Sequence, residues 1–173
     1  MLGYDDLFLF LASHGARHGW SRLRWLVDID RIVRLGHDWG KVSHLMKKYR
    51  MSQVGGQALL LSSQLLSTPL GKELYPITSG KRPRALAQEA LFYLKQMINL
   101  HDEPLPDEIA DYHKRHLFSL MSFPLKLLYI VSFLYPYPMD VEILPLPRNL
   151  HFLYFPLRPV LWAWRKTRDH AWQ

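Results

Sequence analysis

The fold is decided by residues 5–35, which read DDLFLFLASHGARHGWSRLRWLVDIDRIVRL. Apolar side chains recur at helical spacing within this stretch, at Leu7, Leu11, Leu23, Leu26, Ile29 and Val33. Gly15 and Gly19 interrupt the pattern only softly, because a single glycine weakens a helix without necessarily ending it. The stretch therefore predicts either two consecutive helices or one bent helix.

Helical patterns continue along most of the chain. Asp38 is placed to cap a helix over residues 39–49, whose apolar side chains form a single stripe of Trp39, Val42, Leu45, Met46 and Tyr49. Ser52 is placed to cap the next helix, which is apolar on nearly every side and should lie in the core. Two more helical stretches are predicted, over residues 80–98 and from Asp107 onward, where Pro124 kinks or restarts the helix.

Residues 136–159 differ from the rest because they contain six prolines, too many for a regular helix or a central strand. They are predicted to be extended, with their apolar side chains packed on the helices, before a short helix over residues 158–166. Strand signals are too weak to build a sheet. The predicted fold class is therefore all-α: a compact multi-helix domain over residues 1–135, with a Pro-rich, aromatic C-terminal segment over residues 136–173 wrapped on it as part of the same domain.

Composition narrows the classes of protein that need to be considered. The 173 residues include 22 Lys and Arg against 15 Asp and Glu, for a net charge of +7. This balance permits a nucleic acid, a nucleotide or an anionic membrane surface as partner, although such a modest excess commonly serves solubility. The absence of Cys excludes disulfide frameworks, thiolate zinc sites and thiol nucleophiles.

Targeting and membrane signals are weak. The N-terminus has neither a basic region nor a small-residue cleavage site, so we expect no secretory signal and a cytoplasmic location. Residues 117–135 approach the length of a membrane-spanning helix. Lys126, Pro124 and three serines within this stretch instead favour a buried or partly interfacial helix.

The densest group of polar candidates lies between residues 14 and 28. On one continuous helix, an arc of roughly 120° would contain His14, His18, Arg22, Trp25 and Asp28. Two imidazoles four residues apart can bind a metal, but Asp28 would lie roughly 15 Å beyond His18 along the axis, so a metal site is the least favoured interpretation. The alternatives are a polar network that fixes helix packing and a contact with phosphate or substrate.

Other possible sites are less convincing. The triplet Asp28-Ile29-Asp30 resembles a Mg²⁺-binding carboxylate pair, but on a helix the two acids diverge by about 200°. His113 and His116 flank two basic residues and are predicted to lie on a solvated, pH-sensitive face. The sequence has no Gly-rich phosphate loop, nucleophile elbow or kinase signature, so we predict no catalytic residue and no metal ligand.

Residues 6–29, DLFLFLASHGARHGWSRLRWLVDI, closely resemble the C-terminal half of the uncharacterised nucleotidyltransferase family, whose hallmark is D-L-L-x-x-L-x-x-H-G-x-x-H-x-W-x-R-L-x-W-L-x-D-I. The later residues 144–150, LPLPRNL, together with Tyr154 and the Leu-Arg-Pro triplet at 157–159, are similar to the family's closing segment. The matched positions are His14, Gly15, His18, Trp20, Arg22, Leu23, Trp25, Asp28 and Arg148.

This resemblance implies a bacterial protein related to the polymerase-β-like nucleotidyltransferases. Full-length members would transfer a nucleotidyl group from a nucleoside triphosphate (NTP) to an acceptor, using Mg²⁺ and a set of carboxylates. In the family, a catalytic sheet with a Gly-Ser turn and an acidic pair precedes the His-Gly-x-x-His helix, and this chain begins almost at that helix. The resemblance thus implies a fragment, one half of a split gene or a remnant, which is inactive alone and carries no cofactor of its own.

The resemblance also implies partners. The expected ones are an N-terminal catalytic nucleotidyltransferase domain, in the same chain or a separate one, and a nucleotide; neither a specific nucleic acid nor a membrane is expected. The candidate residues 14–28 would then border the cleft between the two domains and touch triphosphate or acceptor. The alternative function is a non-enzymatic interaction module, peripheral to a membrane, that uses residues 117–135 and the aromatic side chains of Trp162, Trp164 and Trp172.

Overall fold

The computed structural model describes residues 3–36, 38–100, 105–135 and 137–170. Its regular elements are helices and no strand occurs in the described ranges, so the all-α fold class is confirmed. Contacts along the chain divide it into two compact units, unit 1 (Met1–Ser122) and unit 2 (Phe123–Gln173). The predicted division at residue 135, with the second part wrapped on the first, stays a prediction.

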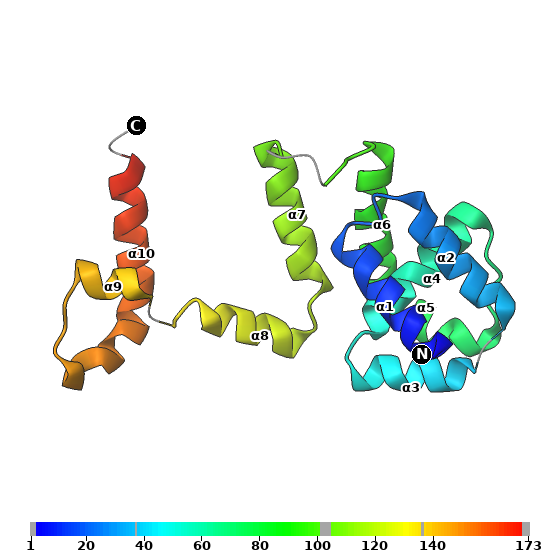
Figure 1. Cartoon of the computed structure of the whole chain (residues 1–173), viewed down its shortest axis with the longest axis horizontal. Coiled ribbons are helices and arrows are strands. Elements are labelled where there is room, and N and C mark those ends of the chain that lie inside the picture. The colour runs from blue at the N-terminus through cyan, green and yellow to red at the C-terminus, as the bar shows by residue number, and fades with distance from the viewer. Residues whose placement is uncertain (1–2, 37, 101–104, 136, 171–173) are drawn as a thin grey trace. The chain divides into compact units, whose positions relative to one another are not determined.

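Unit 1 is a bundle of helices arranged around one central helix. The elements are α1 (Tyr4–Arg17), α2 (Leu23–Leu35), α3 (Trp39–Lys48), α4 (Ser52–Leu66), the 3-10 helix η1 (Lys72–Leu74), α5 (Tyr75–Thr78), α6 (Lys81–Lys95) and α7 (Asp107–Leu120) (Figure 1). Helix α4 packs against α1, α2, α3, α5 and α6. This confirms that the helix that is apolar on nearly every side lies in the core.

The two predicted N-caps have different outcomes. Asp38 caps α3 as predicted, since its side chain accepts a hydrogen bond from the backbone N–H of Lys41 at 3.1 Å. Ser52 does not cap α4, because α4 already begins at Ser52 and its N-cap residue is Met51. The cause lies in the preceding turn, where the N–H of Met51 bonds to the carbonyl of Met46 and Arg50 takes a φ of +56°. This turn ends α3 and leads directly into α4.

Unit 2 contains α8 (Phe123–Ser132), α9 (Pro138–Ile143), the 3-10 helix η2 (Arg148–Leu153) and α10 (Tyr154–His170). Pro124 lies in the first turn of α8, so the helix restarts there, after extended backbone at Met121. The predicted extended conformation is wrong for most of residues 137–159, which form α9, η2 and the start of α10, and Pro136 lies outside the described residues. The closing helix is longer than the predicted residues 158–166. Prolines are tolerated in the first turn of a helix, where the N–H has no intrahelical partner, and Pro138 and Pro156 occupy such positions.

Polar anchors hold the C-terminal part of unit 2 together. Arg158 Nη1 donates to Asp140 Oδ1 at 2.8 Å, and both side chains are buried. The hydroxyl of the buried Tyr154 donates to the carbonyl of Leu144 at 2.6 Å and accepts from the N–H of Leu146 at 2.9 Å. These bonds join α9 and the following loop to α10.

Residues 117–135 approach the length of a membrane-spanning helix. Among the residues that the structure describes, none of the helices combines the length and the apolar character needed to cross a bilayer. In the described structure this stretch is divided between the end of α7 and the whole of α8.

Candidate functional site

The turn between α1 and α2 positions most of the candidate residues. It is a Schellman motif, in which the N–H of Trp20 donates to the carbonyl of Gly15 at 2.8 Å and that of Gly19 donates to the carbonyl of Ala16 at 3.1 Å. Gly19 has a φ of +59° and Trp20 a φ of +55°, both in the left-handed region. Of the two predicted alternatives, the structure therefore contains two helices.

The glycines and the tryptophan of this turn serve packing. A Cβ atom added at Gly15 would overlap the ring of Trp20, which lies directly over the last turn of α1. A Cβ atom at Gly19 would lie 2.5 Å from the ring of Tyr93 on α6. Trp20 and Tyr93 are both fully buried. The H-G-x-x-H-G-W sequence is thus partly a folding signal, because its small residues make room for two large aromatic rings.

The turn brings three of the five candidate residues together. The ring centroids of His14 and His18 are 4.6 Å apart, and that of Trp25 lies 5.1 Å from His14 and 5.6 Å from His18. Trp25 is buried, whereas both imidazoles are half-buried and reach the surface. The cluster of His14, His18 and Trp25, here called the imidazole cluster, therefore presents two titratable rings held by one aromatic side chain.

Arg22 lies elsewhere, at the start of α2. It is the N-cap residue of that helix and is exposed. Helix α2 begins without a side-chain cap and with no acidic residue in its first turn. The N–H of Trp25 donates to the carbonyl of Arg22 at 3.1 Å, which leaves those of Leu23 and Arg24 without an acceptor within the helix. Beside it is a hollow of about 380 Å³, lined by Ser21, Arg22, Leu23, Leu94, Met97, Ile98 and Asn99.

Asp28 is half-buried on α2, one turn beyond Trp25. The single face predicted for a continuous helix does not form, because the chain turns between α1 and α2. The structure therefore divides the five candidates among the imidazole cluster, the hollow beside Arg22 and the following turn of α2.

The neighbouring acid, Asp30, forms an ion pair and a hydrogen bond that stabilise the fold. It accepts from Arg34 Nε at 2.8 Å and from the hydroxyl of Thr68 at 2.7 Å, which ties α2 to the end of α4. The hydrogen bond from Arg34 and that from Thr68 lower the pKa of Asp30, against the opposing effect of burial. No group of three or more His, Asp or Glu side chains in the described ranges is arranged to hold a metal ion. The residues present on this surface do not fit Mg²⁺.

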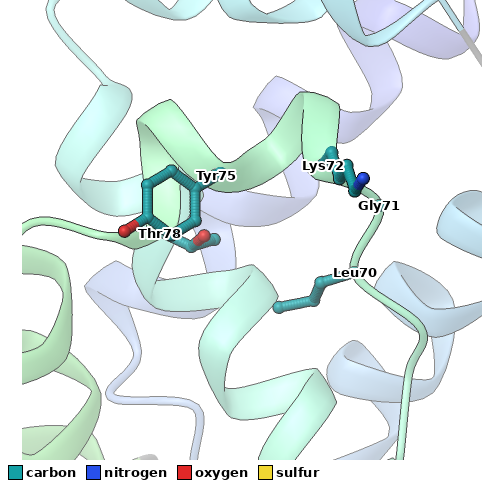
Figure 2. A pocket seen from close by; sticks show the side chains of 5 residues that line it. All are labelled: Leu70, Gly71, Lys72, Tyr75 and Thr78. Atoms are coloured by element: carbon teal, nitrogen blue, oxygen red, sulfur yellow. The ribbon is translucent and has the colours of Figure 1, made fainter.

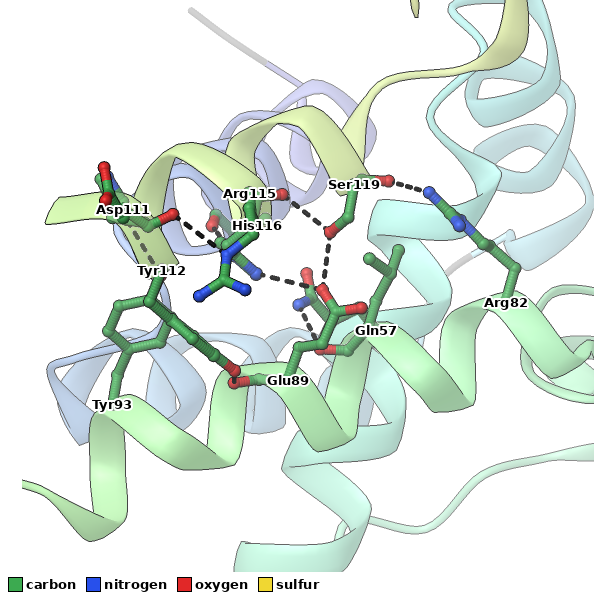
Figure 3. A network of polar contacts seen from close by, with 12 residues as sticks. Gln57, Arg82, Glu89, Tyr93, Asp111, Tyr112, Arg115, His116 and Ser119 are labelled. Atoms are coloured by element: carbon green, nitrogen blue, oxygen red, sulfur yellow. Dashed lines mark hydrogen bonds and ion pairs between the residues drawn. The ribbon is translucent and has the colours of Figure 1, made fainter. Parts of the chain in front are cut away.

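Sequence reasoning missed the residues that pack behind the imidazole cluster. His116 was predicted on a solvated face, but it is only 2% exposed. Its Nε2–H donates to the carbonyl of Ala16 on α1 at 3.0 Å, and its Nδ1 lies 3.5 Å from Glu89 Oε2 (Figure 3). The ring spans α1, α6 and α7, and no local signal could reveal a contact between residues 100 positions apart.

His113 is the half-buried neighbour of this histidine. Its Nδ1 lies 3.0 Å from the hydroxyl of Tyr93. Burial, followed by the nearby His116 and His18, lowers the pKa of His113. Burial raises the pKa of Tyr93. His18 is thus electrostatically coupled to a second histidine on α7.

A second hollow, of about 430 Å³, lies over η1 and α5. It is lined by Leu70, Gly71, Lys72, Tyr75 and Thr78 (Figure 2). None of the five candidate residues lines it. Lys72 is the charged residue of its lining, and this hollow has no part in the site proposed below.

Comparison with known proteins adds one finding. Residues 1–67 match the model of a family described as an uncharacterised nucleotidyltransferase. The match spans α1 to α4, and therefore the imidazole cluster, Arg22 and Asp28, and it supports a nucleotidyltransferase relationship. No curated protein matches the chain. No solved structure matches it either.

Proposed function

We propose that this chain is the helical, C-terminal part of a nucleotidyltransferase related to the polymerase-β-like enzymes. It works with an N-terminal catalytic domain, in the same or a separate polypeptide, that carries the Mg²⁺-binding carboxylates. The family match at residues 1–67 supports this relationship, and it encloses all five candidate residues. The carboxylate of Asp30 is already bonded to Arg34 and Thr68. We therefore assign the Mg²⁺-binding carboxylates to the partner domain.

The open start of α2 is the observation that carries the role of this surface. The N-terminus of a helix attracts anions, because its first N–H groups lack partners and the helix dipole is positive there. The guanidinium of Arg22 adds a full charge and several donors, which suit phosphate oxygens. The adjoining hollow of about 380 Å³ leaves room for a phosphate group at this point. We assign the triphosphate of the NTP to it.

The imidazole cluster is proposed to lie beside the anion site, at the boundary with the catalytic domain. His14 and His18 are the members that reach the surface, and Trp25 holds their rings from behind. A neutral imidazole offers both a hydrogen-bond donor and an acceptor. In the proposal the two imidazoles contact the acceptor substrate or the catalytic domain.

Titration of the chain with tripolyphosphate and with ATP tests the anion site directly. Both ligands should bind, and Arg22→Ala should weaken binding about tenfold, because it removes a charged hydrogen-bond donor at the protein surface. Arg31→Ala is the matched control, since Arg31 is an exposed arginine on the same helix, two turns away, and its loss should leave the affinity unchanged. Calorimetry measures both affinities. Equal losses of affinity for the two variants would show only a diffuse electrostatic attraction and would contradict the proposed anion site.

The partner domain is tested in the genome. Translation of the DNA upstream of the Met1 codon, in all three frames, should reveal a Gly-Ser turn followed by an Asp-x-Asp strand. If no such sequence lies upstream and none is encoded nearby as a separate chain, the chain lacks its catalytic partner and the proposed function fails.

A further inference from the structure

Helix α8 in unit 2 has exposed apolar side chains on most of its circumference, and none of its residues is buried. Phe123 is 79% exposed and Leu128 is 64% exposed. At 100° per residue, the exposed apolar positions fill an arc of roughly 220° around the axis, and Lys126 lies outside this arc. The apolar positions are Phe123, Leu125, Leu127, Leu128, Ile130 and Val131. A broad apolar arc with a basic residue on the remaining side is typical of a helix that lies at a lipid interface.

Helix α10 of the same unit adds aromatic side chains. Trp162 and Trp164 are each about half exposed. A hollow of about 340 Å³ lies beside them, lined by Phe133, Leu134, Arg158, Pro159 and Trp162. The lining is apolar apart from Arg158, whose Nη1 is bonded to Asp140. Exposed Trp side chains beside an apolar hollow are typical of protein surfaces that meet the boundary between lipid headgroups and acyl chains.

The charge of unit 2 complements an anionic surface. Residues 123–173 contain six Lys and Arg but three Asp and Glu. Asp140 and Arg158 are both buried and paired with each other, so their charges cancel. The excess of three basic residues, 6 − 3, therefore comes from the other positions of the unit, and it attracts acidic lipid headgroups.

We propose that unit 2 docks on an anionic lipid surface, with α8 and the Trp side chains of α10 entering the interface. At a lipid surface, the apolar arc of α8 contacts acyl chains while Lys126, on the remaining side, reaches the anionic headgroups. With ten residues, α8 is roughly 15 Å long, about half the thickness of a hydrocarbon core, so it enters one leaflet and does not cross. This inference goes beyond the proposed function and does not depend on it.

Flotation of the full chain with vesicles tests the proposal. The chain should float with phosphatidylglycerol vesicles and much less with phosphatidylcholine vesicles, and added salt should weaken the binding. The double variant Leu128→Glu/Ile130→Glu should lower the bound fraction about tenfold, because it places charges on the inserted helix. The matched control is Leu35→Glu, which changes a residue on α2 of unit 1 that is 67% exposed and should leave binding unchanged.

Circular dichroism and the unfolding midpoint should be the same for the double variant and the original chain, since both changed side chains are exposed. Absence of flotation, or equal loss of binding in Leu35→Glu, would overturn the proposal. So would equal binding to phosphatidylcholine. A concentration-dependent dimer in sedimentation that the double variant abolishes would show instead that a second copy of the chain covers α8.

Discussion

Units 1 and 2 are built from the same kind of element but place their apolar side chains in opposite ways. In unit 1, each helix from α1 to α6 contributes at least one buried apolar residue to a continuous core. Among the described residues of unit 2, the buried apolar side chains are Tyr154 and Leu161. Its other large apolar side chains, including those of α8, are partly or largely exposed.

The contrast shows what stabilises each unit. Unit 1 is held by close packing, so the loss of a large buried side chain leaves a cavity that the surroundings cannot fill. Unit 2 is held by a few buried polar bonds, such as that between Arg158 and Asp140, and most of its large apolar side chains stay partly or largely exposed. Substitutions that are severe in unit 1 should therefore be mild in unit 2.

The largest effect is expected from truncating a tryptophan in unit 1. Trp20→Ala should lower the free energy of unfolding by about 3–5 kcal/mol, because the ring is fully buried over α1. Trp162→Ala in unit 2 should change it by less than about 1 kcal/mol, since that side chain is half exposed. Denaturant unfolding monitored by circular dichroism measures both. Similar losses for the two variants would break the contrast between the units.

A smaller effect separates backbone strain from packing. Gly19→Ala should cost about 2–4 kcal/mol, because it combines the left-handed backbone, roughly 1–2 kcal/mol, with a Cβ atom forced against Tyr93. The control is Gly19→Ala in a Tyr93→Ala background, where the ring that an added Cβ atom would meet is absent. The cost of Gly19→Ala should then fall to the backbone cost alone, and an unchanged cost would deny a role to Tyr93.

The smallest effect concerns polar contacts. Asp30→Asn should cost about 1 kcal/mol at pH 7, because it removes the ion pair with Arg34. The folded state lowers the pKa of Asp30, so this stability is present above the ordinary carboxyl pKa of about 4 and is lost as pH falls through the lowered value. Unfolding measured from pH 7 to pH 2 should show the two proteins converging in acid.

The comparison for that variant is Asp111→Asn. Asp111 pairs with Lys114 on the exposed face of α7, and both side chains are more than two-thirds exposed. This change should cost less than about 0.5 kcal/mol. A larger loss for Asp111→Asn than for Asp30→Asn would contradict the link between α2 and α4.

Local patterns were sufficient to predict the longer helices of unit 1, but not the short η1 and α5, which lie in a stretch that the sequence indicates as a connection. The apolar stripe after Asp38 predicted α3 and its cap, and the continuous apolar run predicted the central position of α4. The proline count misled in unit 2, because it takes no account of where each proline falls within a helix. Pro138 and Pro156 are harmless at the starts of α9 and α10, although Pro159 lies inside α10.

The candidate site was only half accessible to sequence reasoning. Helical spacing predicted that His14 and His18 are neighbours, and this requires only residues of α1 and its C-cap. Trp25 joins them because Gly19 and Trp20 turn the chain, and helical periodicity does not describe such a turn. The burial of His116 depends on α6 and α7 packing against α1, which is a property of the tertiary structure.

The contact between Gly15 and the ring of Trp20 restricts the order in which the sequence can change. Enlarging Gly15 first is blocked, because the new side chain has nowhere to go while the indole is present. Reducing Trp20 first opens the space, at a cost in stability that a larger residue at position 15 can then partly repay. The two positions are therefore epistatic: a larger residue at position 15 is tolerated only after Trp20 has been replaced by a smaller one.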